Sequence, residues 1–195
     1  MLGDLSAKYE SNGDPGCISS GVDDPGGKSY GAYQLASAVG SLGEFVSWLQ
    51  GQSYTFSAAF SGLDLASDAF DAAWKSVAQQ YPDDFLAAQH DYIKAAYYDP
   101  SVSALAAAGW HIENHAAIMQ DVIWSRAVQF GVGNIVDMWN ESCSDMGYPN
   151  LSYIDAQNFD HDLIVQIYQT CISWNGSLSN RFISERADAL AALGT

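Results

Sequence analysis

The sequence predicts a mainly α-helical fold with a small β-hairpin or loop near the N-terminus. Apolar residues recur at helical spacing over most of the 195 residues. Residues 11–30 depart from this spacing and are dense in Gly, Pro, Ser and Asp, a composition typical of loops and turns. We expect the YGAYQL segment, residues 30–35, to leave that loop as a short strand. The length fits one domain spanning residues 1–195.

Capping residues and helix breakers set the expected helix boundaries. Ser41 and Glu44 form the pattern of a capping box at a helix start. Pro82 suits the first turn of another helix, Asp99-Pro100 separates two helices, and Gly109 ends the second of them. The predicted helices cover residues 2–10, 41–50, 68–80, 83–98, 101–108, 112–129, 134–141, 160–172 and 178–193.

The charge balance is strongly acidic, with 23 Asp and Glu against 7 Lys and Arg and a net charge of −16. Such a chain is repelled by nucleic acid and by anionic membrane surfaces, so neither is an expected partner. No run of 18 apolar residues predicts membrane insertion. The first ten residues lack the basic and apolar regions of a signal peptide. If the substrate lies outside the cytoplasm, another device must export the protein, or the chain is a domain of a larger one.

The cysteines and histidines do not indicate a disulfide framework or a metal site. Cys143 and Cys171 could pair, but buried free thiols are the favoured interpretation. His111 and His115 would share one face of a helix, the spacing of some zinc ligands. Glu113 would point off that face and no third ligand is apparent, so we predict a surface helix turn with no metal and no cofactor.

Aromatic residues make up 13% of the chain, and most tryptophans fit a helical core. Those at helical spacing among apolar residues are predicted to be core residues: Trp48, Trp74, Trp124 and Trp139. Trp110 and Trp174 flank expected turns and are candidates for a cleft rim. Arg181 and Glu185 are four residues apart on the last helix and are interpreted as a structural pair.

Carboxylates at both ends of the polar loop are candidates for acid–base chemistry. Glu10 falls where the first predicted helix meets the loop, and partial desolvation there would raise its pKa and keep a proton available. Asp23 and Asp24 follow inside the loop, ahead of a tight turn at Pro25–Gly27. Glycoside hydrolysis uses such an acid with a second carboxylate nearby. By residue type alone, solvated loop charges are the more common interpretation.

The segments around this loop resemble those of cell-wall enzymes. Tyr9–Gly13 looks like the helix-end Glu-Ser-Gly motif of goose-type lysozymes and lytic transglycosylases, and Ser29–Gln34 like their Gly-Ala-x-x-Gln segment. The closer resemblance is to the chitosanase-like lysozyme domains of phage lysins and type VI secretion effectors. Their Asp-Pro-Gly-Gly-x-Ser-Tyr-Gly-x-Tyr-Gln pattern is reproduced by Asp24–Gln34. Asn12 and Phe130 depart from the family, which has Gly and often His there.

Thinner resemblance continues downstream, at Gln89–Ile93, Trp124–Gln129 and Ser177–Arg186. It implies a lysozyme-like fold in which Glu10 is the general acid and Asp24 is the base that activates water, with Asp23 as the rival for the second role. The residues implied to bind substrate are Asp23, Ser29, Tyr30, Tyr33, Gln34 and, on a second wall, Gln129. Core packing of the tyrosines and a local backbone bond of Gln34 stay open as alternatives.

The resemblance favours a peptidoglycan hydrolase that cuts the β-1,4 bond between N-acetylmuramic acid and N-acetylglucosamine, with inversion at the anomeric carbon. A phage particle, a secretion apparatus or an immunity protein would be its partners, and it would act in the periplasm or outside the cell. A chitosanase is the first alternative, because a charge of −16 suits a cationic polymer. A lytic transglycosylase that needs only Glu10, or an inactive glycan-binding module, are further alternatives.

Overall fold

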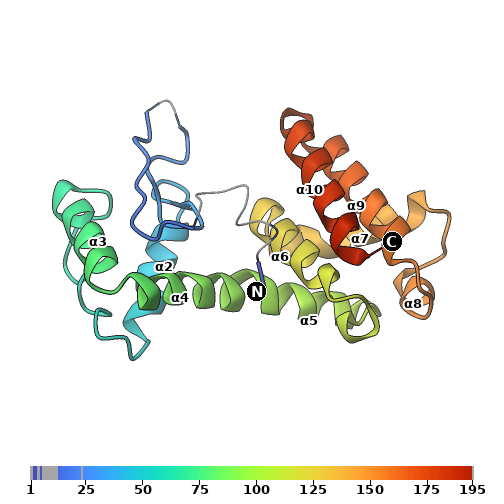
Figure 1. The fold of residues 1–195 in the computed structure, drawn as a ribbon, viewed down its shortest axis with the longest axis horizontal. Coiled ribbons are helices and arrows are strands. Elements are labelled where there is room, and N and C mark those ends of the chain that lie inside the picture. Colours follow the sequence, from blue (N-terminus) through green and yellow to red (C-terminus); the bar gives the residue numbers. More distant parts are fainter. Residues whose placement is uncertain (1, 4, 6–12, 23, 195) are drawn as a thin grey trace. The chain divides into compact units, whose positions relative to one another are not determined.

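The structure is a computed structural model that describes residues 2, 3, 5, 13–22 and 24–194 (Figure 1). Its contacts divide the chain into an N-terminal unit, residues 7–93, and a C-terminal unit, residues 94–195 with residues 1–6. Both units are mainly helical, and the N-terminal unit contains a small antiparallel hairpin. The predicted fold class is therefore confirmed, while a single domain over residues 1–195 stays a prediction. Within the described residues, every helix is too short or too polar to cross a bilayer.

In the N-terminal unit, the hairpin precedes the described helices. The elements are β1 (Ser29–Tyr30), β2 (Leu35–Ala36), α2 (Ser41–Gln50), α3 (Asp68–Gln80) and α4 (Pro82–Ile93). The two strands pair with Ser29 opposite Ala36 and Tyr30 opposite Leu35. Ile18 forms an isolated antiparallel bridge with Tyr30, so the loop ahead of the hairpin also joins this edge. The single strand expected over residues 30–35 is therefore wrong, because residues 31–34 form the turn between two strands.

Helix α2 begins where it was expected, but its cap differs. Gly40 is the N-cap, with a left-handed φ of 100°, and makes no side-chain capping bond. The Ser41 hydroxyl instead accepts the N–H of Ala36 at 2.8 Å, which ties the helix start to β2. The predicted capping box is therefore wrong, because a tertiary contact has taken the hydroxyl that it required.

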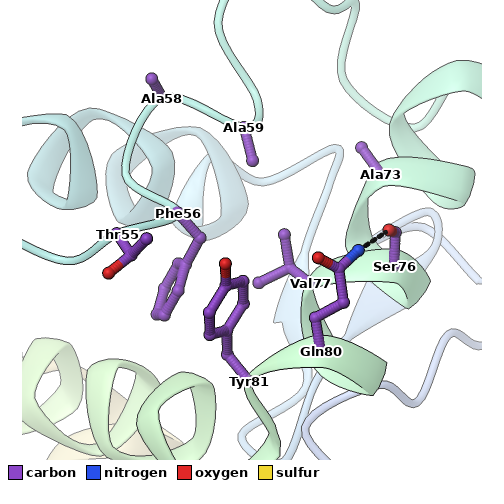
Figure 2. A pocket seen from close by; sticks show the side chains of 9 residues that line it. All are labelled: Thr55, Phe56, Ala58, Ala59, Ala73, Ser76, Val77, Gln80 and Tyr81. Carbon is purple, nitrogen blue, oxygen red and sulfur yellow. Dashed lines mark hydrogen bonds between the residues drawn. The ribbon is translucent and has the colours of Figure 1, made fainter.

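The core of the N-terminal unit is largely aromatic. Phe45, Phe70, Trp74 and Phe85 are fully buried, and the rings of Trp74 and Phe85 meet edge-to-face with centroids 4.7 Å apart. Trp48 is only half-buried and stacks on Phe45, with centroids 6.3 Å apart. At the periphery, the segment between α2 and α3 packs Phe56 against Tyr81 (Figure 2), with ring centroids 5.4 Å apart.

The C-terminal unit is a set of helices in which α9 packs against α7 and α10. Its elements are η1 (Lys94–Tyr98), α5 (Asp99–Ala107), η2 (Ile112–Asn114), α6 (Ile118–Phe130), η3 (Val132–Asn134), α7 (Ile135–Asp145), α8 (Leu151–Asp155), α9 (Asp160–Trp174), η4 (Gly176–Leu178) and α10 (Ser179–Leu193). The π-helical turn η1 leads directly into α5. Pro100 does not interrupt it, because α5 directly follows the π-helical turn, and the backbone is helical at Tyr98 and stays helical through α5. The predicted break at Asp99-Pro100 is wrong.

The long helix predicted from residue 112 starts only at Ile118. Two carboxylates hold the preceding segment outside the helix by binding its backbone. Asp155, at the end of α8, accepts the N–H of His111 at 2.5 Å, and Asp160, at the start of α9, accepts the N–H of Ala116 at 2.7 Å. These partners lie more than 40 residues away, so the local pattern could not reveal them.

The core of the C-terminal unit includes Trp110, Trp124 and Trp139, all fully buried. The core placement of Trp124 and Trp139 is confirmed, and the cleft-rim prediction for Trp110 is wrong. Trp174 is half-buried and donates to Glu141 at 2.9 Å. Two of the cysteines, Cys143 and Cys171, are buried and free, which confirms the favoured interpretation.

Candidate active site

The structure brings most of the expected site residues together in one part of the N-terminal unit. Glu10 and Asp23 lie outside the described residues. Those in the turn before β1, in the hairpin or in its connecting turn are Asp24, Ser29, Tyr30, Tyr33 and Gln34. Gln129 lies in the last turn of α6, in the C-terminal unit, and is half-buried.

Asp24 opens a tight turn with its own side chain. Its Oδ1 accepts the N–H of Gly26 at 2.8 Å, and its backbone carbonyl accepts the N–H of Gly27 at 2.9 Å. Gly27 has a φ of 72°, a conformation that favours glycine. The side chain is exposed, and its Oδ2 makes no hydrogen bond with the part of the chain that the structure describes. One carboxylate oxygen thus shapes the turn while the other faces solvent.

The Asp24 turn is fastened to the hairpin by backbone bonds. The N–H of Ala38 donates to Gly26 at 2.8 Å, and the N–H of Ser37 donates to Lys28 at 2.9 Å. Ser29 is held from the other side, because its N–H donates to the Ser19 hydroxyl at 2.8 Å. The Asp24 turn therefore has a defined position relative to the hairpin.

Tyr30 connects the hairpin to helix α3. Its side chain is fully buried between Phe70 and Trp74, and its hydroxyl donates to Asp71 on α3 at 2.5 Å. Burial and the contact with Asp71 raise the pKa of Tyr30 above its ordinary value. This burial differs from the expectation that Tyr30 lines a cleft, and corresponds to the core-packing alternative.

Asp71 also forms an ion pair with Lys28, with Nζ and Oδ2 2.7 Å apart. Lys28 Nζ donates in addition to the carbonyl of Ala66 at 3.0 Å. Burial alone would raise the pKa of the Asp71 carboxyl, but the hydrogen bonds from Lys28 and Tyr30 outweigh it and lower the pKa. The charged Asp71 carboxylate therefore joins α3 to Lys28, just before β1, and to Tyr30, at its end.

Gln89, a fully buried residue of α4, joins the hairpin turn to the loop after Glu10. Its Oε1 accepts the N–H of Ala32 at 2.9 Å, and its Nε2 donates to the carbonyl of Pro15 at 3.0 Å. Trp74 donates to the same Pro15 carbonyl at 2.9 Å. Sequence reasoning noted Gln89 only as part of a family segment and missed this role. A glutamine among apolar positions of a helix was the available signal.

Tyr33 and Gln34 are half-buried at the end of the hairpin turn. Gln34 has a φ of 52°, uncommon for a residue other than glycine, and its Nε2 donates to the carbonyl of Gly31 at 3.1 Å. The local backbone bond considered for Gln34 is thus present. Backbone held in a sparsely populated region is a common feature of functional sites.

In the C-terminal unit, two segments of the family resemblance meet in a buried ion pair. Arg126 of α6 donates to Glu185 of α10 at 2.6 Å, and both side chains are fully buried. Ser125 also bonds to Glu185. Burial disfavours the Arg126 charge, but Glu185 outweighs this and raises the pKa of Arg126. The predicted pair of Arg181 with Glu185 is present at 3.9 Å, yet Arg126 is the closer partner.

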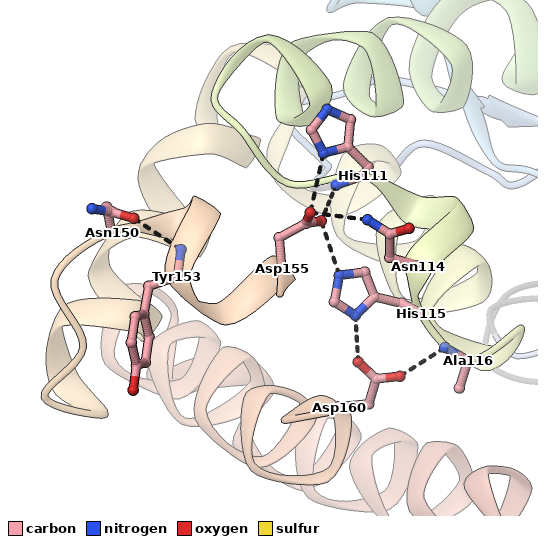
Figure 3. A network of polar contacts seen from close by, with 8 residues as sticks. All are labelled: His111, Asn114, His115, Ala116, Asn150, Tyr153, Asp155 and Asp160. Atoms are coloured by element: carbon pink, nitrogen blue, oxygen red, sulfur yellow. Dashed lines mark hydrogen bonds and ion pairs between the residues drawn. The ribbon is translucent and has the colours of Figure 1, made fainter. Parts of the chain in front are cut away.

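His111 and His115 do not share a helix face, so that prediction is wrong. His115 lies between two carboxylates (Figure 3), with Nδ1 2.6 Å from Asp160 and Nε2 3.3 Å from Asp155. Its ring stacks on Trp110, with centroids 4.0 Å apart. His111 and Asn114 also bond to Asp155. In the described ranges, no group of at least three His, Cys, Asp or Glu side chains is arranged to hold a metal ion.

Comparisons with known proteins match nearly the whole chain. A family model described as "Type VI secretion system spike protein VgrG3-like, C-terminal" matches residues 2–186. The type VI secretion system spike protein VgrG3 of Vibrio cholerae serotype O1 is 34% identical over 203 residues, which cover 95% of this chain. The matched part is 18% of that relative, so this chain spans only a small share of its length.

A solved structure titled "Chitosanase complex structure" has a similar fold, with a TM-score of 0.57 and 18% identity. The match covers 96% of this chain and 74% of the other. The resemblance to chitosanase-like domains and to type VI secretion proteins is thereby confirmed. The chain belongs to the family of VgrG3-like C-terminal domains of type VI secretion system spike proteins.

Proposed function

We propose that this domain is a peptidoglycan hydrolase that cuts the β-1,4 bond between N-acetylmuramic acid and N-acetylglucosamine. The observation that carries the proposal is the Asp24 turn. It presents one open carboxylate oxygen and is hydrogen-bonded to a hairpin that also holds the segment following Glu10. Glycoside hydrolysis uses such a carboxylate together with a proton-donating acid, the role proposed for Glu10.

In the proposed reaction, Glu10 donates its proton to the glycosidic oxygen as the bond to the anomeric carbon breaks. Asp24 accepts a proton from a water molecule, whose oxygen attacks the same carbon from the opposite face. The product is a new reducing end with inverted configuration. This mechanism requires the two carboxyl groups to be about 6.5–9.5 Å apart, so that the water fits between them. Asp23 is the alternative base.

Other residues would bind or position the glycan. Ser29, Tyr33 and Gln34 are proposed to contact sugar hydroxyl and acetamido groups, since they lie half-buried in or beside the hairpin. Gln129 belongs to the C-terminal unit and stays a predicted substrate contact. Tyr30 is proposed to position the hairpin through Asp71, because its own side chain is fully buried.

We further propose that a type VI secretion apparatus delivers the domain to the periplasm of a target cell. Membership of the VgrG3-like C-terminal family supports this route. An immunity protein in the producing cell is the expected partner of such a lytic domain.

A chitosanase is the second candidate. Two observations favour it: the fold similarity to a chitosanase structure and the net charge of −16, which attracts a polymer of protonated glucosamine. We rank it second because net charge describes the whole surface, and not the cleft in particular.

The test is incubation of the protein with purified peptidoglycan and, separately, with chitosan, followed by mass analysis of the products. Muropeptides with reducing ends are the expected result. Anhydro ends would instead indicate a transglycosylase that uses Glu10 alone. Cleavage of chitosan without cleavage of peptidoglycan would overturn the proposed substrate.

The catalytic assignment is tested with three isosteric variants. Glu10→Gln is expected to abolish cleavage, and Asp24→Asn to lower it by at least about 100-fold, the scale of general base catalysis. Asp23→Asn is expected to retain most activity and serves as the matched control. The reverse ranking of the two aspartate variants would move the base to Asp23, and activity in both would indicate a mechanism with Glu10 alone.

A further inference from the structure

Helix α3 presents two opposite faces to different surroundings. On one face, Asp71 bonds to Lys28 and Tyr30, and Trp74 bonds to the Pro15 carbonyl. With 100° between successive residues, Ala73, Ser76 and Gln80 lie on the opposite face, and Val77 lies between the two faces. A site on this second face is therefore separate from the face that supports the hairpin.

This second face lines a pocket of about 490 Å³ (Figure 2). The opposite wall is the segment 55–59 that precedes α3, and Tyr81 lies between Phe56 and Val77. Most of the lining is exposed to solvent, so the pocket is an open surface groove rather than an enclosed cavity. The pocket belongs entirely to the N-terminal unit.

The lining combines small apolar side chains, aromatic rings and neutral polar groups. Ala59, Ala73 and Val77 contribute the apolar part, and the ring of Phe56 lies beside that of Tyr81. Gln80 donates through Nε2 to the Ser76 hydroxyl at 2.7 Å, which leaves its amide oxygen available as an acceptor. The Tyr81 hydroxyl makes no hydrogen bond with the described residues and points into the pocket.

We propose that this pocket binds an N-acetylated hexosamine unit of a glycan strand. The Gln80 amide oxygen can accept the acetamido N–H, and the Tyr81 hydroxyl can donate to the acetamido carbonyl. The acetyl methyl group would contact Ala73, and the apolar face of the sugar ring would contact the half-buried ring of Tyr81, because Phe56 and Val77 are themselves buried in the core. All lining residues are uncharged, although the chain carries 23 acidic residues. A protonated glucosamine would thus find no counter-charge in the lining.

The pocket would be a second binding site for the polymer, apart from the catalytic residues. Because α3 separates it from the hairpin-supporting face, it holds a glycan segment other than the one being cut. Binding at two places on one polymer raises the effective concentration of the glycan at the catalytic residues. This inference rests on the proposed function only in taking the same polymer as ligand.

The test is an NMR titration of the full chain carrying Glu10→Gln with tetra-N-acetylchitotetraose. The backbone amides of Ser76, Gln80 and Tyr81 are expected to shift and saturate. Tyr81→Phe and Gln80→Ala should each weaken this binding about fivefold, the effect of one neutral hydrogen bond. Gln79→Ala is the matched control, because Gln79 is exposed in the same helical turn and does not line the pocket.

The proposal is overturned if these amides do not shift, or if tetraglucosamine binds there as tightly. Ala73→Leu, which fills the pocket, must suppress the shifts; their persistence would place the ligand elsewhere. Peptidoglycan cleavage by the parent chain is measured separately. Cleavage without binding in the pocket rejects only this inference, and binding in the pocket without cleavage rejects only the proposed function.

Discussion

Gln89 accepts the N–H of Ala32 through Oε1 at 2.9 Å, and this contact brings the hairpin turn against helix α4. The neighbouring Gly31 has a φ of 73°, and a β-carbon there would lie 2.2 Å from the same oxygen. The turn thus depends on glycine both for its backbone conformation and for the close approach of the Gln89 amide.

Gly31→Ala is therefore expected to displace the Gln89 amide and destabilise the hairpin. Gly13→Ala is a closely matched control, because Gly13 has a φ of 75° and nothing within 4 Å of its β-carbon position. The control should lose only the about 1–2 kcal/mol of a left-handed alanine. Gly31→Ala should lose at least about 1–3 kcal/mol more, because buried polar groups lose their partners. Urea unfolding of both variants measures the difference, and equal losses would contradict the role of Gln89.

Asp24 combines a structural and a proposed chemical role, and two substitutions separate them. Asn keeps an oxygen for the N–H of Gly26 but cannot take a proton from water, so Asp24→Asn should lose activity at nearly unchanged stability. Asp24→Ala should lose activity and also about 0.5–1.5 kcal/mol, the worth of one hydrogen bond. Glycan cleavage and thermal unfolding are measured on both. Full activity in the Asn variant would leave Asp24 with only its structural role.

The Arg126–Glu185 pair is expected to be needed for folding, because both side chains are fully buried. Glu185→Gln leaves the guanidinium without a counter-charge and should cost about 3–5 kcal/mol. The double variant Arg126→Met, Glu185→Leu removes both charges and should recover much of that loss. Arg181→Ala is the control, with an expected loss below about 1 kcal/mol, because its contact is partly exposed and 3.9 Å long. A double variant less stable than Glu185→Gln alone would contradict this account.

Acid should weaken the C-terminal unit through Asp155 and Asp160. Burial alone would raise the pKa of each carboxyl. Bonds from His111 and Asn114 to Asp155, and from His115 and Ala116 to Asp160, outweigh burial and lower both pKa values. A carboxyl with a lowered folded pKa stabilises fully above its unfolded pKa of about 3.9, and this contribution is lost as pH falls through the folded pKa.

The free energy of unfolding is thus expected to fall with acidification below about pH 4, where the unfolded carboxyls begin to take up protons. Asp160→Asn should lower stability at neutral pH and flatten this acid slope, because the titrating group is removed. Asp137→Asn, at an exposed position of α7, should leave the slope as in the parent chain. Chemical unfolding from pH 7 to pH 2 tests this. An unchanged slope in Asp160→Asn would remove Asp160 from the explanation.

The sequence predicted the helical class and most helix positions, because apolar spacing reflects burial along each helix. It failed where a side chain bonds outside the predicted helix or a distant partner binds its backbone. The Ser41 hydroxyl bonds to β2 rather than capping α2, and the start of α6 is delayed by Asp155 and Asp160. Trp110 was predicted at a cleft rim, whereas the ring of His115 stacks on it in the structure. His115 belongs to a segment that was predicted to be a surface helix turn.

At the candidate site, local pattern predicted the Asp24 turn because glycine and proline specify tight turns directly. The supports of the hairpin could not be predicted in this way. Asp71 and Gln89 come from helices 41 and 57 residues further along the chain than their partners Tyr30 and Ala32. Neither residue belongs to a local motif that indicates such a contact. The folded chain alone reveals them.

The three cysteines, all among the described residues, are free, and Cys143 and Cys171 are buried. Burial raises the pKa of both thiols, so little reactive thiolate forms. No disulfide bond stabilises the described residues, and the thiols of Cys143 and Cys171 are shielded from oxidants. The arrangement of the described residues therefore forms without a disulfide-forming catalyst, and a reductant finds no disulfide in it to break.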